Sequence, residues 1–102
     1  MFQSKLIEQI ENEWAESTGF LGKLRIGEFD GDGLHRLCDS LSKISPDESD
    51  RFDRRLISLT WYIPMFMTWQ RERVLARGGN IEELEQAINR VQSILENLLG
   101  VP

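Results

Sequence analysis

Acidic residues in a glycine-rich segment stand at the spacing of a calcium-binding loop. From Glu28 to Asp39, oxygen-bearing side chains fall at loop positions 1, 3, 5 and 12, and Gly33 falls at position 6, where such a loop turns sharply. The final aspartate reaches bidentate geometry poorly, His35 replaces the usual apolar residue, and no helix pattern leads into the segment. We therefore interpret it as a turn ending in a helix cap and expect no metal or other cofactor.

His35 and Cys38 are three residues apart, as a nucleophile and its base could be. Such a pair needs an orienting group and an exposed pocket, and no pattern in the sequence indicates either. Cys38 falls on the apolar face of a predicted helix, so we interpret it as a small buried residue. None of the seventeen carboxylates stands at a spacing that singles out an acid–base catalyst. We expect a protein without enzymatic activity.

The uncharged run Leu56–Gln70 holds two of the three tryptophans, the single tyrosine and two of the three methionines. It spans about fifteen residues and contains Pro64, whereas a membrane-spanning helix needs about twenty apolar residues. We interpret the run as core. The alternative is a ligand pocket behind a kink, lined by Met65, Phe66, Met67 and Trp69.

The polar atoms of the larger aromatic residues in this run need partners, and such residues are common at interfaces. One of three is therefore a candidate for exposure at a binding surface: Trp61, Tyr62 or Trp69.

Charge is distributed unevenly over a chain whose net charge is −5: residues 1–50 carry −6 and residues 51–102 carry +1. Binding to nucleic acid requires a basic face, so we do not expect a nucleic-acid partner. An acidic surface suits a basic protein, although it also keeps a protein soluble. Residues Met1–Glu8 lack the pattern of a signal peptide, and we expect a cytoplasmic location without membrane attachment.

The apolar periodicity predicts an all-α, single-domain bundle of four to six helices over residues 1–102. A first helix is predicted over about 2–18, and residues 20–33 are predicted to form a loop with one helical turn. A second helix is predicted over 33–44, capped by Asp32. Its inward residues are Leu34, Leu37, Cys38, Leu41 and Ile44.

The third helix is predicted to begin at Ser45–Glu48, which combines a capping residue, proline and glutamate. Pro64 should kink or break it near 62–64, before it continues to about 77. Apolar residues on both sides of its first half predict an enclosed, central helix. These are Phe52, Leu56, Leu59 and Ile63 on one face and Ile57 and Trp61 on the other.

The fourth helix is predicted over 81–99, after Gly78–Gly79, with Asn80 and Glu83 as a capping box. Its predicted inward residues are Ile81, Leu84, Ile88, Val91, Leu95 and Leu99.

Two stretches, Gly19–His35 and Arg55–Val74, resemble a known family. They are similar to the small α-helical immunity proteins of bacterial contact-dependent growth inhibition systems, in particular the type paired with an RNase A-like toxin domain. The resemblance implies a cytoplasmic, non-enzymatic protein that binds its cognate toxin domain in a 1:1 complex and covers the nuclease active site. It supplies no catalytic residues and no residue-by-residue toxin contacts.

An RNase attracts phosphate and therefore has a positive cleft, which an acidic inhibitor complements. The candidate toxin-binding residues are Glu28, Asp30, Asp32, Asp47, Glu48 and Asp50. An alternative face consists of Glu82, Glu85 and Glu96. Each of these carboxylates could instead cap a helix or face water.

The sequence is also compatible with two other functions. One is an α-helical adaptor or regulator, which could form a homodimer through the aromatic surface. The other is a small-molecule or metal binder that uses the kink pocket or the loop at Asp30–Asp32.

Overall fold

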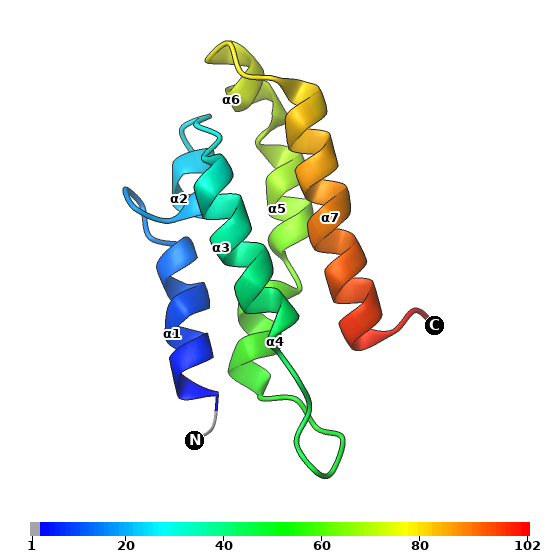
Figure 1. Ribbon diagram of the computed structural model, residues 1–102. Coiled ribbons are helices and arrows are strands. Elements are labelled where there is room, and N and C mark those ends of the chain that lie inside the picture. Colours follow the sequence, from blue (N-terminus) through cyan, green and yellow to red (C-terminus); the bar gives the residue numbers. More distant parts are fainter. Residues whose placement is uncertain (1–2) are drawn as a thin grey trace.

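The computed structural model describes residues 3–102, in which helices are joined by turns and no strand occurs (Figure 1). The predicted all-α bundle is confirmed. Phe2, which the sequence places in the first helix, lies outside the described residues. The helices are α1 (Ser4–Glu13), α2 (Phe20–Leu24), α3 (Gly31–Ser42), α4 (Arg54–Thr60), α5 (Ile63–Trp69), α6 (Arg71–Ala76) and α7 (Ile81–Leu99).

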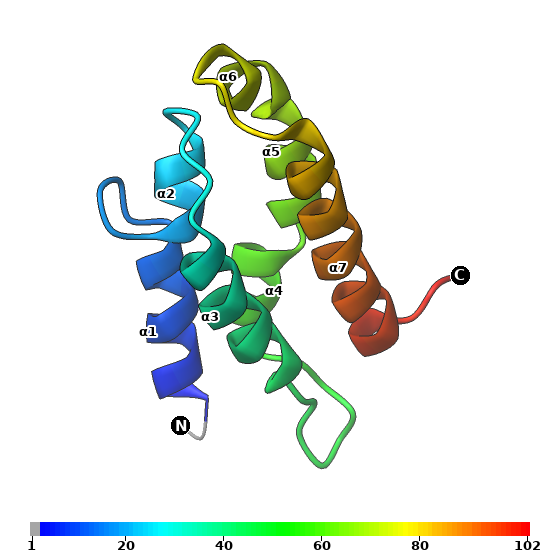
Figure 2. The same cartoon turned by 45° about the horizontal axis from the view of Figure 1, so that its top comes forward.

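The helices form two layers. α3 packs between α1 and α7, while α4 packs against α1 and α5 packs against α7. Figures 1 and 2 show α4 and α5 on the far side of α3, with α2 and α6 at one end of the molecule. The Cα atoms extend over 46 × 30 × 18 Å. The shortest of these dimensions fits two layers of helices, whose axes pack about 8–10 Å apart.

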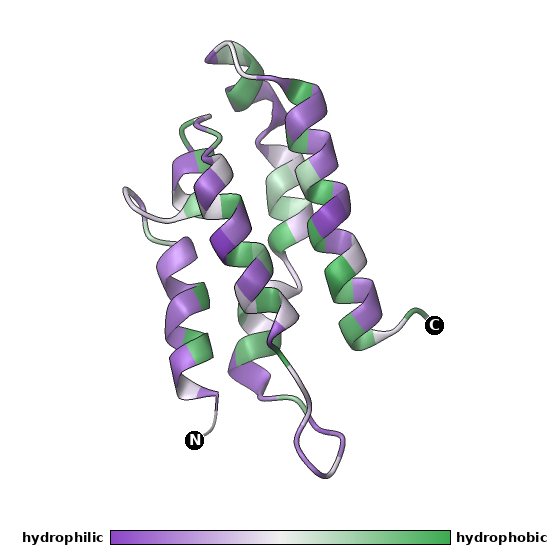
Figure 3. Ribbon diagram, in the orientation of Figure 1, coloured by the Kyte–Doolittle hydropathy of each residue, from purple (hydrophilic) through white to green (hydrophobic). Residues whose placement is uncertain are grey.

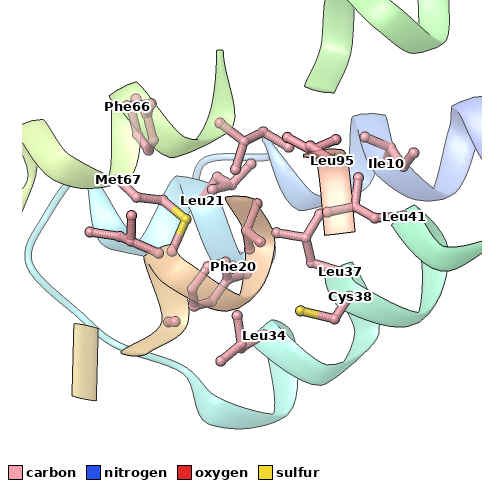
Figure 4. Close-up of a cluster of buried hydrophobic side chains, with 14 of the residues drawn as sticks. Ile10, Phe20, Leu21, Leu34, Leu37, Cys38, Leu41, Phe66, Met67 and Leu95 are labelled. Carbon is pink, nitrogen blue, oxygen red and sulfur yellow. The ribbon is translucent and has the colours of Figure 1, made fainter. Parts of the chain in front are cut away.

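The core lies between the two layers. The five inward residues predicted for the second helix are all buried. In Figure 4 the side chains of α3 belong to one buried cluster with Phe20 and Leu21 of α2, Ile10 of α1, and Met67 of α5. Trp14, which follows α1, closes one side: its ring lies 4.9 Å from that of Phe66, and its Nε1 donates to the carbonyl of Leu59 at 3.0 Å.

The prediction for α7 is confirmed at both ends, Ile81 and Leu99. The carboxamide of Asn80 accepts a hydrogen bond from the backbone N–H of Glu83 at 3.2 Å, which caps the helix. The α7 ribbon alternates between hydrophilic and hydrophobic bands in Figure 3, as an amphipathic helix should. One predicted inward residue is wrong: Leu99 is 43% exposed.

Two predicted helix starts are wrong. Ser45–Glu48 lies in an irregular segment, because the Asp47 carboxylate accepts hydrogen bonds from the backbone N–H groups of Ser49 and Arg51 at 2.8 and 3.0 Å. This local turn competes with helix formation. α4 begins only at Arg54, where Asp53 accepts from the backbone N–H of Arg55 at 2.8 Å.

The second wrong start concerns α3. Its N-cap residue is Asp30, and Asp32 lies in the first turn. α1 also ends earlier than predicted, at Glu13, because the chain then turns so that α2 can pack against the end of α1.

The third predicted helix breaks rather than kinks. α4 ends at Thr60 and α5 begins at Ile63, with Pro64 in its first turn, where the missing N–H is not needed. Trp61 and Tyr62, which join the two helices, keep right-handed helical angles. The prediction of an enclosed central helix is wrong, since Trp61 is 58% exposed.

Candidate protein interaction surface

The first candidate carboxylates lie at the start of α3. The Asp30 carboxylate is 2.9 Å from the ammonium group of Lys23 and 3.9 Å from the guanidinium of Arg36. The hydrogen bond from Lys23 lowers the pKa of Asp30 below its usual value, and burial only partly opposes this effect. Asp30 therefore ties α2 to α3, whereas Glu28 and Asp32 are exposed.

The second group of candidate carboxylates lies in the segment between α3 and α4. Asp47 holds the turn described above, and Glu48 and Asp50 are exposed. This segment and the α2–α3 turn lie at opposite ends of α3 (Figure 1), and the 12 residues of that helix span about 18 Å. The six predicted residues therefore form two separate acidic groups.

The alternative acidic face on α7 also divides. Glu82 is exposed in the first turn, and Glu85 forms an ion pair with Arg71 of α6 at 2.6 Å. Glu96, near the other end of α7, lines a surface groove. Of the three, only Glu96 lines this groove, which is largely apolar and is described below.

The structure separates His35 from Cys38. Cys38 is buried, which raises the pKa of its thiol, and its side chain points into the cluster of Figure 4. His35 is exposed, and its Nδ1 lies 3.3 Å from a guanidinium nitrogen of Arg90. Within residues 3–102, no three side chains of His, Cys, Asp or Glu converge on a position that could hold a metal ion.

A buried carboxylate that the sequence analysis missed is Glu13, at the end of α1. Its oxygens accept hydrogen bonds from the backbone N–H of Phe20 at 3.0 Å and from two nitrogens of Arg36 at 3.1 and 3.3 Å. The hydrogen bond to Glu13 raises the pKa of Arg36. The sequence holds a signal for this role, since Glu13 follows Ile10 by three residues and thus shares the apolar face of α1.

An apolar groove lies between α5 and α7, with a volume of about 490 Å³. Its walls contain large side chains that are strongly exposed: Trp61 at 58%, Met65 at 46%, Trp69 at 62% and Leu99 at 43%. The remaining lining residues are Pro64, Thr68, Gln92, Leu95, Glu96 and Gly100. The predicted exposure of an aromatic residue from the uncharged run is confirmed at two positions.

A second groove of about 420 Å³ continues from the first, because Thr68 and Trp69 line both. It adds Leu75, which is 62% exposed, and Ile81. We call the surface formed by Trp61, Met65, Trp69, Leu75 and Leu99 the apolar strip. Sequence analysis expected one exposed aromatic residue and missed the extent of the strip, although Trp61, Met65 and Trp69 recur every four residues and thus share one helical face.

Carboxylates border the apolar strip. Glu96 lines the first groove and Glu72 the second, and neither forms an ion pair within residues 3–102. Glu96 accepts a hydrogen bond from the carboxamide of Gln92 at 3.2 Å. The strip is thus a hydrophobic surface edged by negative charge that no cation in the described part of the chain neutralises. Within residues 3–102, every helix is too short or too polar to traverse a bilayer.

Comparisons with protein-family models, with curated protein sequences and with solved structures find no match to this chain.

Proposed function

We propose that the chain is an immunity protein that neutralises a nuclease toxin, an RNase, in the cytoplasm. It binds the toxin domain in a 1:1 complex and covers the active site, without binding nucleic acid itself. The apolar strip is the observation that carries this proposal. Tryptophan and methionine are enriched in protein interfaces, and a cluster of exposed apolar side chains edged by polar ones is typical of a binding surface.

The choice of a nuclease as the partner is supported by charge and by resemblance. The chain carries −5, and its two acidic groups at the ends of α3 face solvent with Glu28, Asp32, Glu48 and Asp50. A nuclease cleft must be positive to bind RNA, so the two proteins attract each other before contact. The stretches Gly19–His35 and Arg55–Val74 supply the resemblance to immunity proteins.

The test is reconstitution with a toxin. The gene next to the one for this chain should encode a large secreted protein that ends in a nuclease domain. The purified toxin domain should elute with this chain as a 1:1 complex on gel filtration, and its cleavage of RNA should stop at equimolar inhibitor. Separate elution at both low and moderate salt would exclude the proposal.

A homodimeric adaptor is the second candidate, because the same apolar strip could pair with its own copy. Light scattering distinguishes the two. An immunity protein should keep the mass of one chain as its concentration rises, whereas an adaptor that pairs through the strip should approach twice that mass.

A further inference from the structure

We propose that the apolar strip receives an amphipathic helix of the partner, with lysine or arginine residues beside its apolar face. The inference rests on the proposed function for the identity of the partner, but the occupant itself follows from the shape and charge of the strip.

The spacing of the strip matches that of a helix. Trp61 lies at the junction of α4 and α5, and Met65 and Trp69 follow it in α5. Each is four residues from the next, which places them at intervals of about 6 Å. A helix lying alongside presents its own apolar side chains at similar intervals, through positions i, i+4 and i+7. The groove is open along the junction of α5 and α7, with Leu99 at one end and Trp69 leading into the second groove. A helix can therefore anchor several side chains, whereas an isolated loop would fill only part of the surface.

The charge at the edge selects a basic helix. Within residues 3–102, Glu72 and Glu96 border the two grooves without forming an ion pair, and the one cation in the lining, Arg71, is already paired with Glu85. Glu96 accepts a hydrogen bond from the carboxamide of Gln92 at 3.2 Å, which leaves its charge uncompensated. Positive side chains that flank the apolar face of an incoming helix can therefore pair with Glu72 and Glu96. The same charges disfavour a second copy of this chain, because pairing two strips would gather four carboxylates without a cationic partner between molecules that each carry −5.

The first experiment uses a synthetic peptide of about 18 residues, which spans about 27 Å as a helix. Leucine occupies positions i, i+4, i+7 and i+11, and lysine and arginine occupy the flanking positions. A matched peptide carries glutamate in place of every basic residue. Calorimetric titration should detect binding of the basic peptide and none of the acidic one. Absence of binding, or equal binding of the two peptides, would overturn the proposal.

Variants then locate the binding. Trp69→Glu should weaken binding about 30-fold or more, the usual loss at an aromatic anchor, although the added negative charge favours a basic peptide elsewhere. Ile26→Glu is the matched control, since Ile26 is 56% exposed on the α2–α3 turn, and it should leave binding within about twofold. The pair Glu72→Gln and Glu96→Gln should weaken binding about fivefold. Equal losses for Trp69→Glu and Ile26→Glu would show non-specific attraction and reject the groove.

The toxin complex separates this inference from the proposed function. If the toxin domain elutes with the wild-type chain and with Trp69→Glu alike, the immunity function stands and the groove proposal fails. If the toxin domain does not bind the wild-type chain at all, the proposed function fails, and the peptide titration still decides whether the strip takes a basic helix.

Discussion

The carboxylate of Glu13 holds the guanidinium of Arg36 through two hydrogen bonds, across the junction of α1 and α3. The Glu13 side chain is 7% exposed and that of Arg36 is 51% exposed, so the anion is the buried partner. Glu13 also accepts the first free backbone N–H of α2, from Phe20. One side chain thus joins three helices, and removal of its cation leaves a buried negative charge.

Replacement Arg36→Met should destabilise the fold by about 1–3 kcal/mol, because Glu13 then lacks its charged partner inside the protein. Urea unfolding measures this loss. The control is Arg55→Met, which removes the exposed ion pair between Glu11 and Arg55. That change should cost about 1 kcal/mol or less. Equal losses would mean that burial of Glu13 does not matter.

The second prediction concerns a glycine in the α2–α3 turn. Gly27 has φ of +82°, and a Cβ there would overlap the backbone carbonyl of Arg73 on α6. Gly27→Ala should therefore lower the free energy of unfolding by more than the penalty of the left-handed backbone alone. Displacement of the neighbouring carbonyl should add about 1–3 kcal/mol.

Gly78 provides the matched control, since its φ is +80° but no heavy atom lies within 4 Å of the point where an added Cβ would stand. Gly78→Ala should cost only about 1–2 kcal/mol, the penalty of the backbone conformation. Thermal unfolding of both variants measures the difference. A loss at Gly78 as large as that at Gly27 would contradict a close approach between the turn and α6.

The sequence predicted the inward face of α3 and the bounds of α7 well, because each is a long helix with one continuous apolar face. Both carry buried residues at intervals of three and four, and α7 has Asn80 at its start. Periodicity and capping are local, so they can be read from neighbouring residues without knowledge of the rest of the fold.

The errors occurred where tertiary contacts or competing local bonds decide the outcome. Ser45–Glu48 matches a helix start, but the Asp47 carboxylate prefers the backbone N–H groups of its own turn. Trp61 fits the pattern of an enclosed helix, yet the break before Pro64 leaves it in solvent. The extent of the apolar strip was missed for a related reason, since a run of large apolar residues indicates a core unless the number of covering helices is known.

The thiol of Cys38 provides a probe of global unfolding. The side chain is 1% exposed, and burial raises its pKa, so little reactive thiolate forms in the native protein near pH 8. An aromatic disulfide reagent should therefore react with Cys38 at the rate of protein opening, and fast reaction should appear only in denaturant. Rapid modification of the native chain would show that α3 opens locally. The exposed free cysteine obtained from Ser42→Cys in a Cys38→Ala background gives the rate for an accessible thiol on the same helix.

If the chain inhibits a basic nuclease, the distant acids and the apolar strip should act on different rate constants. Glu28→Gln, Asp32→Asn, Glu48→Gln and Asp50→Asn together remove four exposed charges outside the strip. They should lower the association rate with the toxin domain about tenfold at low salt and leave dissociation unchanged, because long-range attraction accelerates encounter. The difference should vanish at about 1 M salt, where charges are screened within about 3 Å.

Trp69→Glu should instead accelerate dissociation, since a packed side chain stabilises the bound state after encounter. Stopped-flow association and dissociation at several salt concentrations measure both effects, and faster dissociation of the four-charge variant would place those carboxylates in direct contact with the toxin.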